Sequence, residues 1–201
     1  TWSSKDICLL HGVTASGKTE IYIHLINEAI KQGKQVLFLL PEIVLTSQLT
    51  DRLRKVFGNR LGVYHSKYTD AERVEVYRKQ ISDSPYDILI GVRSSVLLPF
   101  RNLGLVIIDE EHESSYKSES TPRFSAKDVA KFRAVHHNCL LLLASATPSV
   151  ESYAAAQSGK YELCTLSNRY GNAVLPEVLT VDMRSEPKAE NSKAISQTLY
   201  Q

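Results

Sequence analysis

Residues 7–19 read ICLLHGVTASGKT, an apolar run followed by a loop that contains two glycines. The apolar run predicts a buried strand over 7–10, and the amphipathic pattern behind the loop predicts a helix over 18–32. From Gly12 to Thr19 the sequence matches GxxxxGK[ST], the phosphate-binding loop, which requires a strand before it and a helix after it. The stretch therefore predicts a nucleotide-binding α/β fold.

Each position of this loop is a candidate contact for the phosphates of ATP. The positions are Gly12, Val13, Thr14, Ala15, Ser16, Gly17, Lys18 and Thr19. The backbone N–H groups would surround the β- and γ-phosphates at the helix N-terminus, Lys18 would neutralise phosphate charge, and the Thr19 hydroxyl would coordinate Mg²⁺. The alternative is a glycine-containing turn that binds nothing, and a match at every motif position in its proper context disfavours it.

The alternation of apolar strands and amphipathic helices continues along the chain. Further strands are expected at 36–40, 61–64, 87–92, 104–108 and 139–144, and further helices at 44–57, 69–82, 125–136 and directly after Pro148. Continuous apolar strand runs indicate burial on both faces, and repeated β-then-α order indicates a parallel sheet with helices on both sides. The predicted fold class is α/β with one open parallel sheet.

The pattern weakens after about residue 168. Residues 177–183 could form one more strand, 184–193 are polar and resemble a linker, and 194–201 resemble the start of a helix. The expected organisation is therefore a nucleotide-binding lobe over 1–168 and a connecting segment over 169–201.

Composition restricts the classes of protein that remain. A net charge of +2 is too small to indicate nucleic-acid or membrane binding by itself, so any such function must depend on local patches. No apolar run reaches the ~18 residues of a membrane-spanning helix. Cys8, Cys139 and Cys164 have no CxxC spacing, which favours reduced cysteines in a cytoplasmic protein and disfavours a zinc site in this chain.

A carboxylate cluster follows the apolar run at 104–108. In a parallel sheet its first members, Asp109 and Glu110, would emerge at the same edge as the phosphate-binding loop. Asp109 would hold Mg²⁺, and Glu110 would orient or deprotonate the attacking water, which makes Glu110, Lys18 and Asp109 the candidate catalytic residues. The alternative is a solvated acidic strand end, which the nearby Lys18 loop disfavours.

Several motifs carry a resemblance to superfamily 2 helicases. Residues 109–112 (DEEH) resemble their Asp-Glu-x-His box, 145–147 (SAT) their coupling motif, and 40–43 (LPEI) the motif after their second strand. Longer stretches resemble more narrowly the PriA family of replication-restart (primosomal) helicases. These are LLHGVTASGKTEIY (9–22), YHSKYTDAER (64–73), DILIGVRSSVLLPFRNLGLVIIDEEHESSYK (87–117), PRFSAKDVAKFRA (122–134) and SATPSVESY (145–153).

The resemblance implies a RecA-like P-loop NTPase lobe of a helicase that uses ATP and Mg²⁺ to move 3′ to 5′ on single-stranded DNA. It implies forked DNA and replication restart proteins as partners, and no membrane. It also implies that His112 contacts the coupling motif at Ser145 or Thr147. In that family the segment after the acidic box is an aromatic-rich loop that senses DNA.

Candidate DNA contacts lie in that loop and at two strand ends. They are Tyr116, Lys117, Arg123 and Phe124 in the loop, Arg93 and Ser94 after the fourth strand, and His65 after the third. Aromatic faces stack on bases without sequence preference, and basic side chains contact phosphates. The alternatives are ordinary packing for the aromatics and for His65, and a structural surface role for Arg93. The family commonly has a Trp near 121–124, which this sequence lacks.

The resemblance also implies parts that lie outside these 201 residues. These are the helix that helps hold the adenine, the preceding DNA-binding domains, a zinc-binding insertion, and a second lobe with an arginine finger. Zinc is expected only there. Two other functions stay open: a DNA translocase of a restriction or repair system, and an ATP-binding replication scaffold with low turnover.

Overall fold

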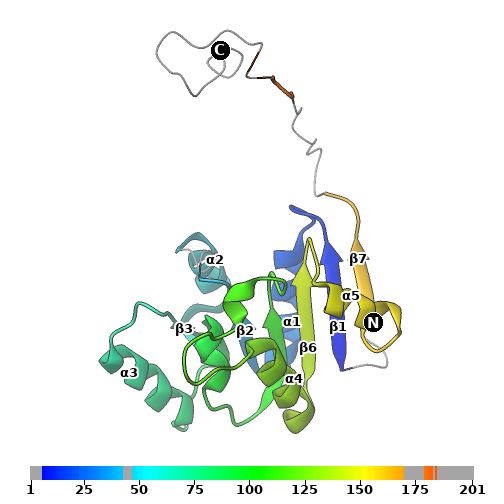
Figure 1. Ribbon diagram of the computed structural model, residues 1–201. Helices are drawn as coiled ribbons and strands as arrows, with labels where there is room; N and C mark the ends of the chain where they lie inside the picture. Colours follow the sequence, from blue (N-terminus) through cyan, green and yellow to red (C-terminus); the bar gives the residue numbers. More distant parts are fainter. Residues whose placement is uncertain (1–5, 43–46, 170–178, 183, 185–201) are drawn as a thin grey trace. The chain divides into compact units, whose positions relative to one another are not determined.

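The computed structural model describes residues 6–42, 47–169, 179–182 and 184 (Figure 1). The chain divides into two units, Thr1–Tyr170 and Gly171–Gln201, and the architecture described below belongs to the first.

Seven parallel strands form one sheet within the described residues. They are β1 (Ile7–Gly12), β2 (Gln35–Leu39), β3 (Leu61–Tyr64), β4 (Ile88–Gly91), β5 (Leu103–Ile108), β6 (Leu140–Ser145) and β7 (Glu162–Leu166). Their order across the sheet is β3-β4-β2-β5-β6-β1-β7. The predicted α/β class with an open parallel sheet is confirmed, and six of the strands lie within two residues of their expected bounds.

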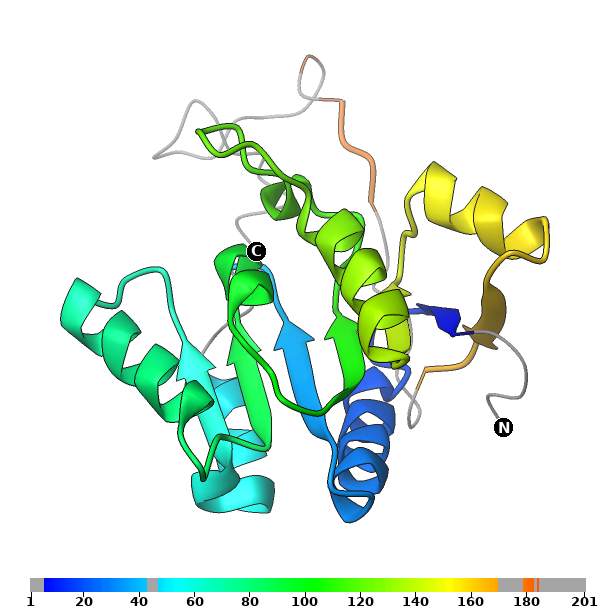
Figure 2. The ribbon, with the colours of Figure 1, turned by 90° about the horizontal axis from the view of Figure 1, so that it is seen from below.

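Helices cover both faces of the sheet, as predicted. They are α1 (Lys18–Lys31), α2 (Ser47–Phe57), α3 (Asp70–Ile81), α4 (Ala126–His137) and α5 (Val150–Gln157), with short 3-10 turns at Gly58–Arg60, Arg93–Leu97 and Ser114–Tyr116. One core cluster packs α1 and α2 against the sheet, and a second packs α3, α4 and α5 against the other face. Figure 2 shows α1 and α4 on opposite sides of the strands.

Three helices begin at residues whose side chains cap the first turn. The Thr69 side chain accepts a hydrogen bond from the Glu72 backbone N–H, and the Glu72 carboxylate accepts one from the Thr69 N–H at 2.7 Å, which completes a capping box. Ser125 caps α4 and Ser149 caps α5 in the same way, each accepting from the N–H three residues on. The α5 helix is the one expected after Pro148.

In the later part of the chain, the structure shows one strand that was not expected and contradicts one that was. The strand β7 was not predicted, although it pairs with β1 at the edge of the sheet. The strand expected over 177–183 does not form at 179–182, which have no regular secondary structure. The rest of that expected strand, most of the linker expected at 184–193 and the helix expected at 194–201 lie outside the described residues.

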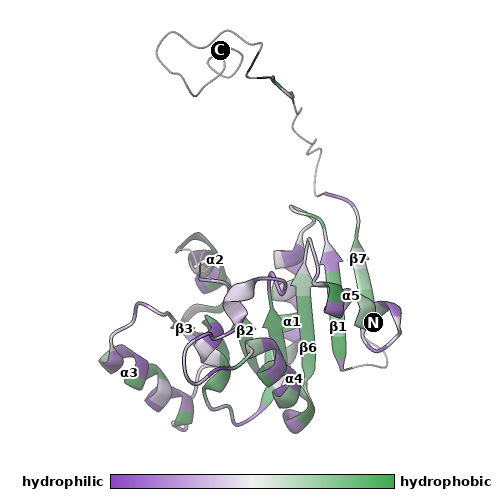
Figure 3. Cartoon of the chain, in the orientation of Figure 1, coloured by the Kyte–Doolittle hydropathy of each residue, from purple (hydrophilic) through white to green (hydrophobic). Residues whose placement is uncertain are grey.

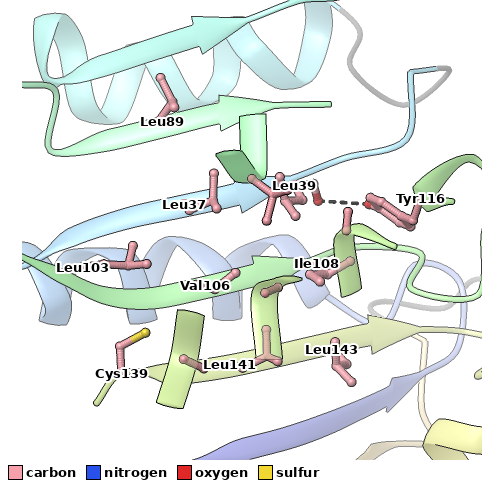
Figure 4. Packing of buried hydrophobic residues seen from close by; sticks show 14 of the residues in the cluster. Leu37, Leu39, Leu89, Leu103, Val106, Ile108, Tyr116, Cys139, Leu141 and Leu143 are labelled. Carbon is pink, nitrogen blue, oxygen red and sulfur yellow. Dashed lines mark hydrogen bonds between the residues drawn. The ribbon is translucent and has the colours of Figure 1, made fainter. Parts of the chain in front are cut away.

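The central strands are buried on both faces, which explains their continuous apolar sequence. Every residue of β2 is buried, and the strands of the sheet are coloured largely as hydrophobic in Figure 3. Figure 4 shows the cluster under α4, where Leu37, Val106 and Leu141 from three adjacent strands pack together. This rigid sheet aligns the strand ends that form the site.

Strand register brings the motif-bearing ends to one edge. Ser145 of β6 pairs with His11 of β1, one residue before Gly12, and Ile108 of β5 pairs with Leu143 of β6. The phosphate-binding loop, the acidic box and the predicted coupling motif therefore leave the sheet side by side, as expected for the carboxyl edge of an open α/β sheet.

Candidate nucleotide site and acidic box

The loop between β1 and α1 has the backbone geometry of a phosphate cradle. Gly17 precedes the helix at φ 86°, in the left-handed region that favours glycine. A Cβ on Gly12 would lie 2.8 Å from the Ser16 hydroxyl oxygen, so glycine lets the loop close over the strand end without a shift of the Ser16 side chain. The first turn of α1 has backbone N–H groups without intrahelical acceptors, and these can bind an anion.

A hollow of about 490 Å³ opens above this loop. Its lining consists of residues 15–20 and Arg52, whose guanidinium pairs with the Glu20 carboxylate. Arg52 had no expected role in the sequence, because nothing in the pattern of α2 indicates that it reaches across to α1.

Lys18 connects the loop to the acidic box. Its ammonium group donates a hydrogen bond of 2.9 Å to the Gly12 carbonyl oxygen and lies 3.9 Å from the Glu110 carboxylate. The two motifs that the sequence placed 92 residues apart, at 18 and 110, thus face each other across the sheet edge. An anionic phosphate group would find a cation and backbone donors on one side and the acidic box on the other.

Asp109 is held in one orientation by its neighbours. Its Oδ1 accepts hydrogen bonds from the Tyr22 hydroxyl at 2.8 Å and from the Glu110 backbone N–H at 3.0 Å. Both bonds go to the same oxygen, so Oδ2 can accept a further ligand. Burial raises the pKa of this carboxyl above its usual value, although the Tyr22 hydroxyl, the Glu110 N–H and Lys18 favour the charged form.

Glu110 adopts a conformation that is uncommon for its residue type. Its φ is 44°, in the left-handed region, which turns the chain sharply after β5. Burial and the adjacent Asp109 raise the pKa of the Glu110 carboxyl, while Lys18 and His112 act in the opposite direction. A carboxylate with a raised pKa beside a phosphate-binding loop is suited to accept a proton.

The structure brings His112 and Ser145 together. Their Nδ1 and Oγ atoms lie 2.8 Å apart, and His112 Nδ1 is also 3.5 Å from the Glu110 carboxylate. Ser145 Oγ accepts a hydrogen bond from the Thr147 backbone N–H at 2.9 Å, so Thr147 joins this group through its backbone. The acidic box and the end of β6 are therefore linked by direct hydrogen bonds.

Glu111 was not a candidate residue in the sequence, yet its side chain is the most extensively hydrogen-bonded of the acidic box. Its carboxylate is fully buried and accepts hydrogen bonds from Lys127, Ser149 and Ser152. Burial alone would raise the pKa of this carboxyl, but the hydrogen bonds from Lys127 and the Ser149 N–H outweigh it and lower the pKa below its usual value. Only the tertiary structure reveals these partners.

The expectation that Tyr116 stacks on DNA bases was wrong. The Tyr116 ring is only 1% exposed and belongs to the core cluster under α4, so neither of its faces is available to a base. Its hydroxyl donates hydrogen bonds to the backbone oxygens of Asp109 at 2.6 Å and Leu39 at 3.2 Å, the second of which is drawn in Figure 4. A single tyrosine in a polar stretch resembles a surface residue, but the alternative of ordinary packing is the one that the structure shows for Tyr116.

The other expected DNA contacts lie at or near the surface. Lys117, Arg123 and Ser94 are exposed, while His65, Arg93 and Phe124 are partly exposed. Arg93 Nη1 donates hydrogen bonds to the carbonyl oxygens of Ser115 and Lys117, at 3.1 and 2.5 Å. His65 Nδ1 accepts a hydrogen bond from the Lys67 backbone N–H at 3.0 Å.

The donors and acceptors of the edge fit a nucleotide with a divalent cation. Within the described ranges no group of three or more His, Cys, Asp and Glu side chains could hold a metal ion. Mg²⁺ does not need such a group, because it retains waters and takes the remaining ligands from substrate phosphates and one or two protein oxygens. In this lobe, Asp109 Oδ2 and the Thr19 hydroxyl would be the protein oxygens of this kind.

Comparison with known proteins agrees with this geometry. The chain belongs to the DEAD/DEAH box helicase family, whose model matches residues 1–156. Within that family it is 48% identical over 195 residues to the replication restart protein PriA of Bacillus subtilis, and 45% identical over 184 residues to that of Rickettsia felis. The resemblance to the PriA family is confirmed.

These alignments cover most of the chain but little of the relatives. They include 97% and 92% of this chain, and 24% and 28% of the two PriA proteins. Among solved structures, RecG bound to a three-way DNA junction matches with a TM-score of 0.56 and 24% identity, over 81% of this chain and 20% of RecG. That similarity supports the RecA-like fold.

Across the described residues, no helix combines the length and the apolar character that crossing a membrane requires.

Proposed function

We propose that this chain is the ATP-binding lobe of an ATP-dependent 3′-to-5′ DNA helicase that acts in replication restart and couples ATP hydrolysis to translocation on single-stranded DNA. Residues 1–168 form the lobe, and 169–201 lead toward a second lobe. The observation that carries the proposal is the approach of Lys18 to Glu110 at 3.9 Å, at the same sheet edge as Asp109. That arrangement places phosphate recognition beside a carboxylate base.

ATP would bind with its phosphates in the loop from Gly12 to Thr19. Lys18 would exchange its contact with the Gly12 carbonyl for phosphate oxygens, because a charged acceptor makes the stronger hydrogen bond. Thr19 and Asp109 would hold Mg²⁺, and the ion would neutralise charge that develops on the phosphates. Tyr22 supports this role, since it fixes the Asp109 carboxylate from α1.

Glu110 would orient the attacking water and take its proton. The raised pKa of its carboxyl supports this role, and Lys18 keeps the carboxylate directed toward the phosphate loop. His112 would report the state of Glu110 to the end of β6, because it contacts both Glu110 and Ser145. A change at Ser145 would in turn affect Thr147, whose backbone N–H donates a hydrogen bond to the Ser145 hydroxyl.

DNA would bind across the surface formed by the loop after the acidic box and the turn after β4. Lys117 and Arg123 provide positive charge, Phe124 provides a partly exposed ring, and Ser94 provides an exposed hydroxyl. Arg93 lies just after β4, and His65 lies just after the neighbouring strand β3. The relatives support DNA as the partner, since PriA is named a replication restart protein and RecG was solved on a DNA junction. The proposed partners are forked DNA and other replication restart proteins, and the proposed location is the cytoplasm.

ATPase activity of the full-length protein, measured while single-stranded DNA is added, tests the proposal. We expect strong stimulation by DNA and weaker stimulation by RNA of the same length. Lys18→Ala should abolish turnover yet leave DNA binding measurable, whereas Lys31→Ala at the other end of α1 should behave as wild type. A flat response to DNA would indicate the ATP-binding scaffold instead, and turnover by Lys18→Ala would refute the assignment of the loop.

A further inference from the structure

Glu111 lies where three functional segments meet. Its backbone N–H donates a hydrogen bond of 3.0 Å to the Ala144 carbonyl oxygen, which ties the acidic box to β6. Its side chain is 0% exposed and points toward α4 and α5. No step of the proposed hydrolysis uses this carboxylate, although it sits directly between the proposed base, Glu110, and His112.

Lys127 connects Glu111 to the loop that follows the box. Its ammonium group lies 2.8 Å from Glu111 Oε2, and its side chain is 17% exposed. Lys127 is the second residue of α4, directly after the bridge between Lys117 and Ser125 that closes the loop. Any displacement of the loop base therefore acts on Lys127 before it acts on the rest of the helix.

Ser149 and Ser152 connect Glu111 to the segment after β6. The Ser149 backbone N–H donates to Glu111 Oε1 at 2.6 Å, and the hydroxyls of Ser149 and Ser152 donate to Oε2 at 3.0 and 2.9 Å. Both serines belong to the N-terminal turn of α5, four residues and more beyond Ser145. The carboxylate thus fixes the position at which the chain leaves the predicted coupling motif.

Four donors surround this one carboxylate, three at Oε2 and one at Oε1. The side chain is also fully buried, so neither a metal ion nor a catalytic water reaches it from solvent. A buried charge that loses a partner is strongly destabilised, so the three segments are held in a single relative arrangement. Apolar packing could also hold these segments together, but apolar contacts are not directional and would let one segment shift along another more easily than these hydrogen bonds do.

We propose that Glu111 is a positioning residue that transmits movement of the DNA-sensing loop to the ATP site, with Lys127 as its receiver on α4. When the base of the loop is displaced, Lys127 moves with it, and the ion pair displaces Glu111 in turn. The adjacent Glu110 and His112 then change their orientation toward the phosphates. The Ser149 and Ser152 contacts pass the same displacement to the segment after Ser145. This inference rests on the proposed function, because it concerns the coupling of DNA to hydrolysis.

Lys127→Met in the full-length protein tests the inference. It removes the link to α4 and keeps the three donors from α5, so Glu111 stays hydrogen-bonded. Basal ATPase should stay within about twofold of wild type, while stimulation by single-stranded DNA should fall by about tenfold or more. Lys127→Arg retains the cation and should restore stimulation. Asp128→Asn, which removes an exposed ion pair from the same helix turn, is the matched control and should behave as wild type.

A merely structural ion pair would give a different result. In that case Lys127→Met would lower the melting temperature and leave the ratio of stimulated to basal activity unchanged, which would overturn the inference. If Lys127→Met does not fold, Lys127→Gln retains a hydrogen-bond donor without the charge, and the same ratio decides. A normal ratio in that variant would overturn the inference as well.

Hydrogen exchange separates failure of this inference from failure of the proposed function. A wild-type protein without any DNA stimulation would refute the proposed function. The inference would then be decided by exchange at residues 126–137 on addition of Mg²⁺ with a non-hydrolysable ATP analogue. A nucleotide response in wild type that is lost in Lys127→Met supports the inference. A response that persists in the variant, or none in wild type, overturns it.

Discussion

The Tyr116 hydroxyl lies 2.6 Å from the backbone carbonyl oxygen of Asp109, the residue proposed to hold Mg²⁺. The same hydroxyl is 3.2 Å from the carbonyl oxygen of Leu39, at the end of β2. Tyr116 therefore joins the loop to the ends of two adjacent strands from within the core. Its buried ring anchors the loop, so the proposed DNA contacts are assigned to the exposed residues around it.

Tyr116→Phe should impair basal and DNA-stimulated ATPase together. The substitution keeps the ring in its cavity and removes the hydroxyl that donates to the Asp109 carbonyl oxygen, at a cost of about 1–3 kcal/mol in the free energy of unfolding. The Leu39 carbonyl oxygen keeps the Asp109 backbone N–H as a donor. Thermal unfolding and ATPase at several DNA concentrations measure both effects. Tyr77→Phe, at an exposed position of α3, is the control. Selective loss of stimulation, with wild-type stability and basal rate, would show that the hydroxyl serves DNA sensing alone.

Tyr22→Phe should weaken binding of the divalent cation. Without the Tyr22 hydroxyl, Asp109 Oδ1 keeps only the hydrogen bond from the Glu110 N–H, so the orientation of the carboxylate toward the site is less firmly fixed. Loss of such an outer partner typically lowers metal affinity by about 10–100-fold. Binding of Mn²⁺, followed by electron paramagnetic resonance in the presence of a non-hydrolysable ATP analogue, measures this directly. Unchanged Mn²⁺ affinity would mean that Tyr22 only packs against Phe38, its ring neighbour at 5.3 Å.

Glu110→Gln should retain nucleotide binding and lose turnover. Glutamine keeps the shape of the side chain and cannot accept the proton of the attacking water, so the rate should fall by about 10²–10⁴-fold. Equilibrium binding of a fluorescent ATP analogue and steady-state hydrolysis separate the two effects. Glu119→Gln, at an exposed loop position, is the control. A collapse of nucleotide affinity with near-normal turnover would instead indicate that Glu110 is the metal-holding residue.

Much of the fold could be predicted because buried parallel strands have continuous apolar sequences. This pattern located β1 to β6, and the phosphate-loop motif oriented them. The strand β7 differs, since most of its side chains are exposed at the sheet edge and its sequence, ELCTL, mixes polar and apolar residues. Glu111 was missed, and Tyr116 was expected to stack on DNA, for a related reason. A local pattern records residue type, whereas their burial depends on segments far away in the sequence.

The three cysteines provide a test of the β7 edge. Cys164 on β7 is exposed, whereas Cys8 and Cys139 are buried. Burial raises the pKa of the Cys139 thiol to about 11 and that of Cys8 further, so neither forms much thiolate near neutral pH. One thiol should therefore react rapidly with a disulfide reagent at pH 8, and three after denaturation. Cys164→Ser should remove the rapid phase. Two rapid thiols in the native protein would contradict this edge position of β7.

The structure gives Arg93 a second role besides the proposed contact with DNA, and the two roles can be separated by experiment. Its guanidinium binds the carbonyl oxygens of Ser115 and Lys117, on either side of Tyr116, so it clamps the loop as well as facing the proposed DNA path. A planar guanidinium with several donors can bridge two carbonyls, and a lysine ammonium at this position cannot keep the same geometry. Arg93→Lys therefore separates charge from geometry.

We expect Arg93→Lys to retain the salt dependence of DNA binding and to lose most DNA stimulation of ATPase. Charge is conserved, so the slope of log affinity against log salt should match wild type, whereas Arg93→Ala should reduce that slope by about one. Fluorescence anisotropy with single-stranded DNA at several salt concentrations gives the slope, and ATPase gives the stimulation. Arg101→Lys is the control, since its guanidinium binds Asp83 and the Ile81 carbonyl oxygen elsewhere on the lobe. Full stimulation in Arg93→Lys would show that Arg93 acts only as a point charge toward phosphate, because the clamp on the loop would then be dispensable.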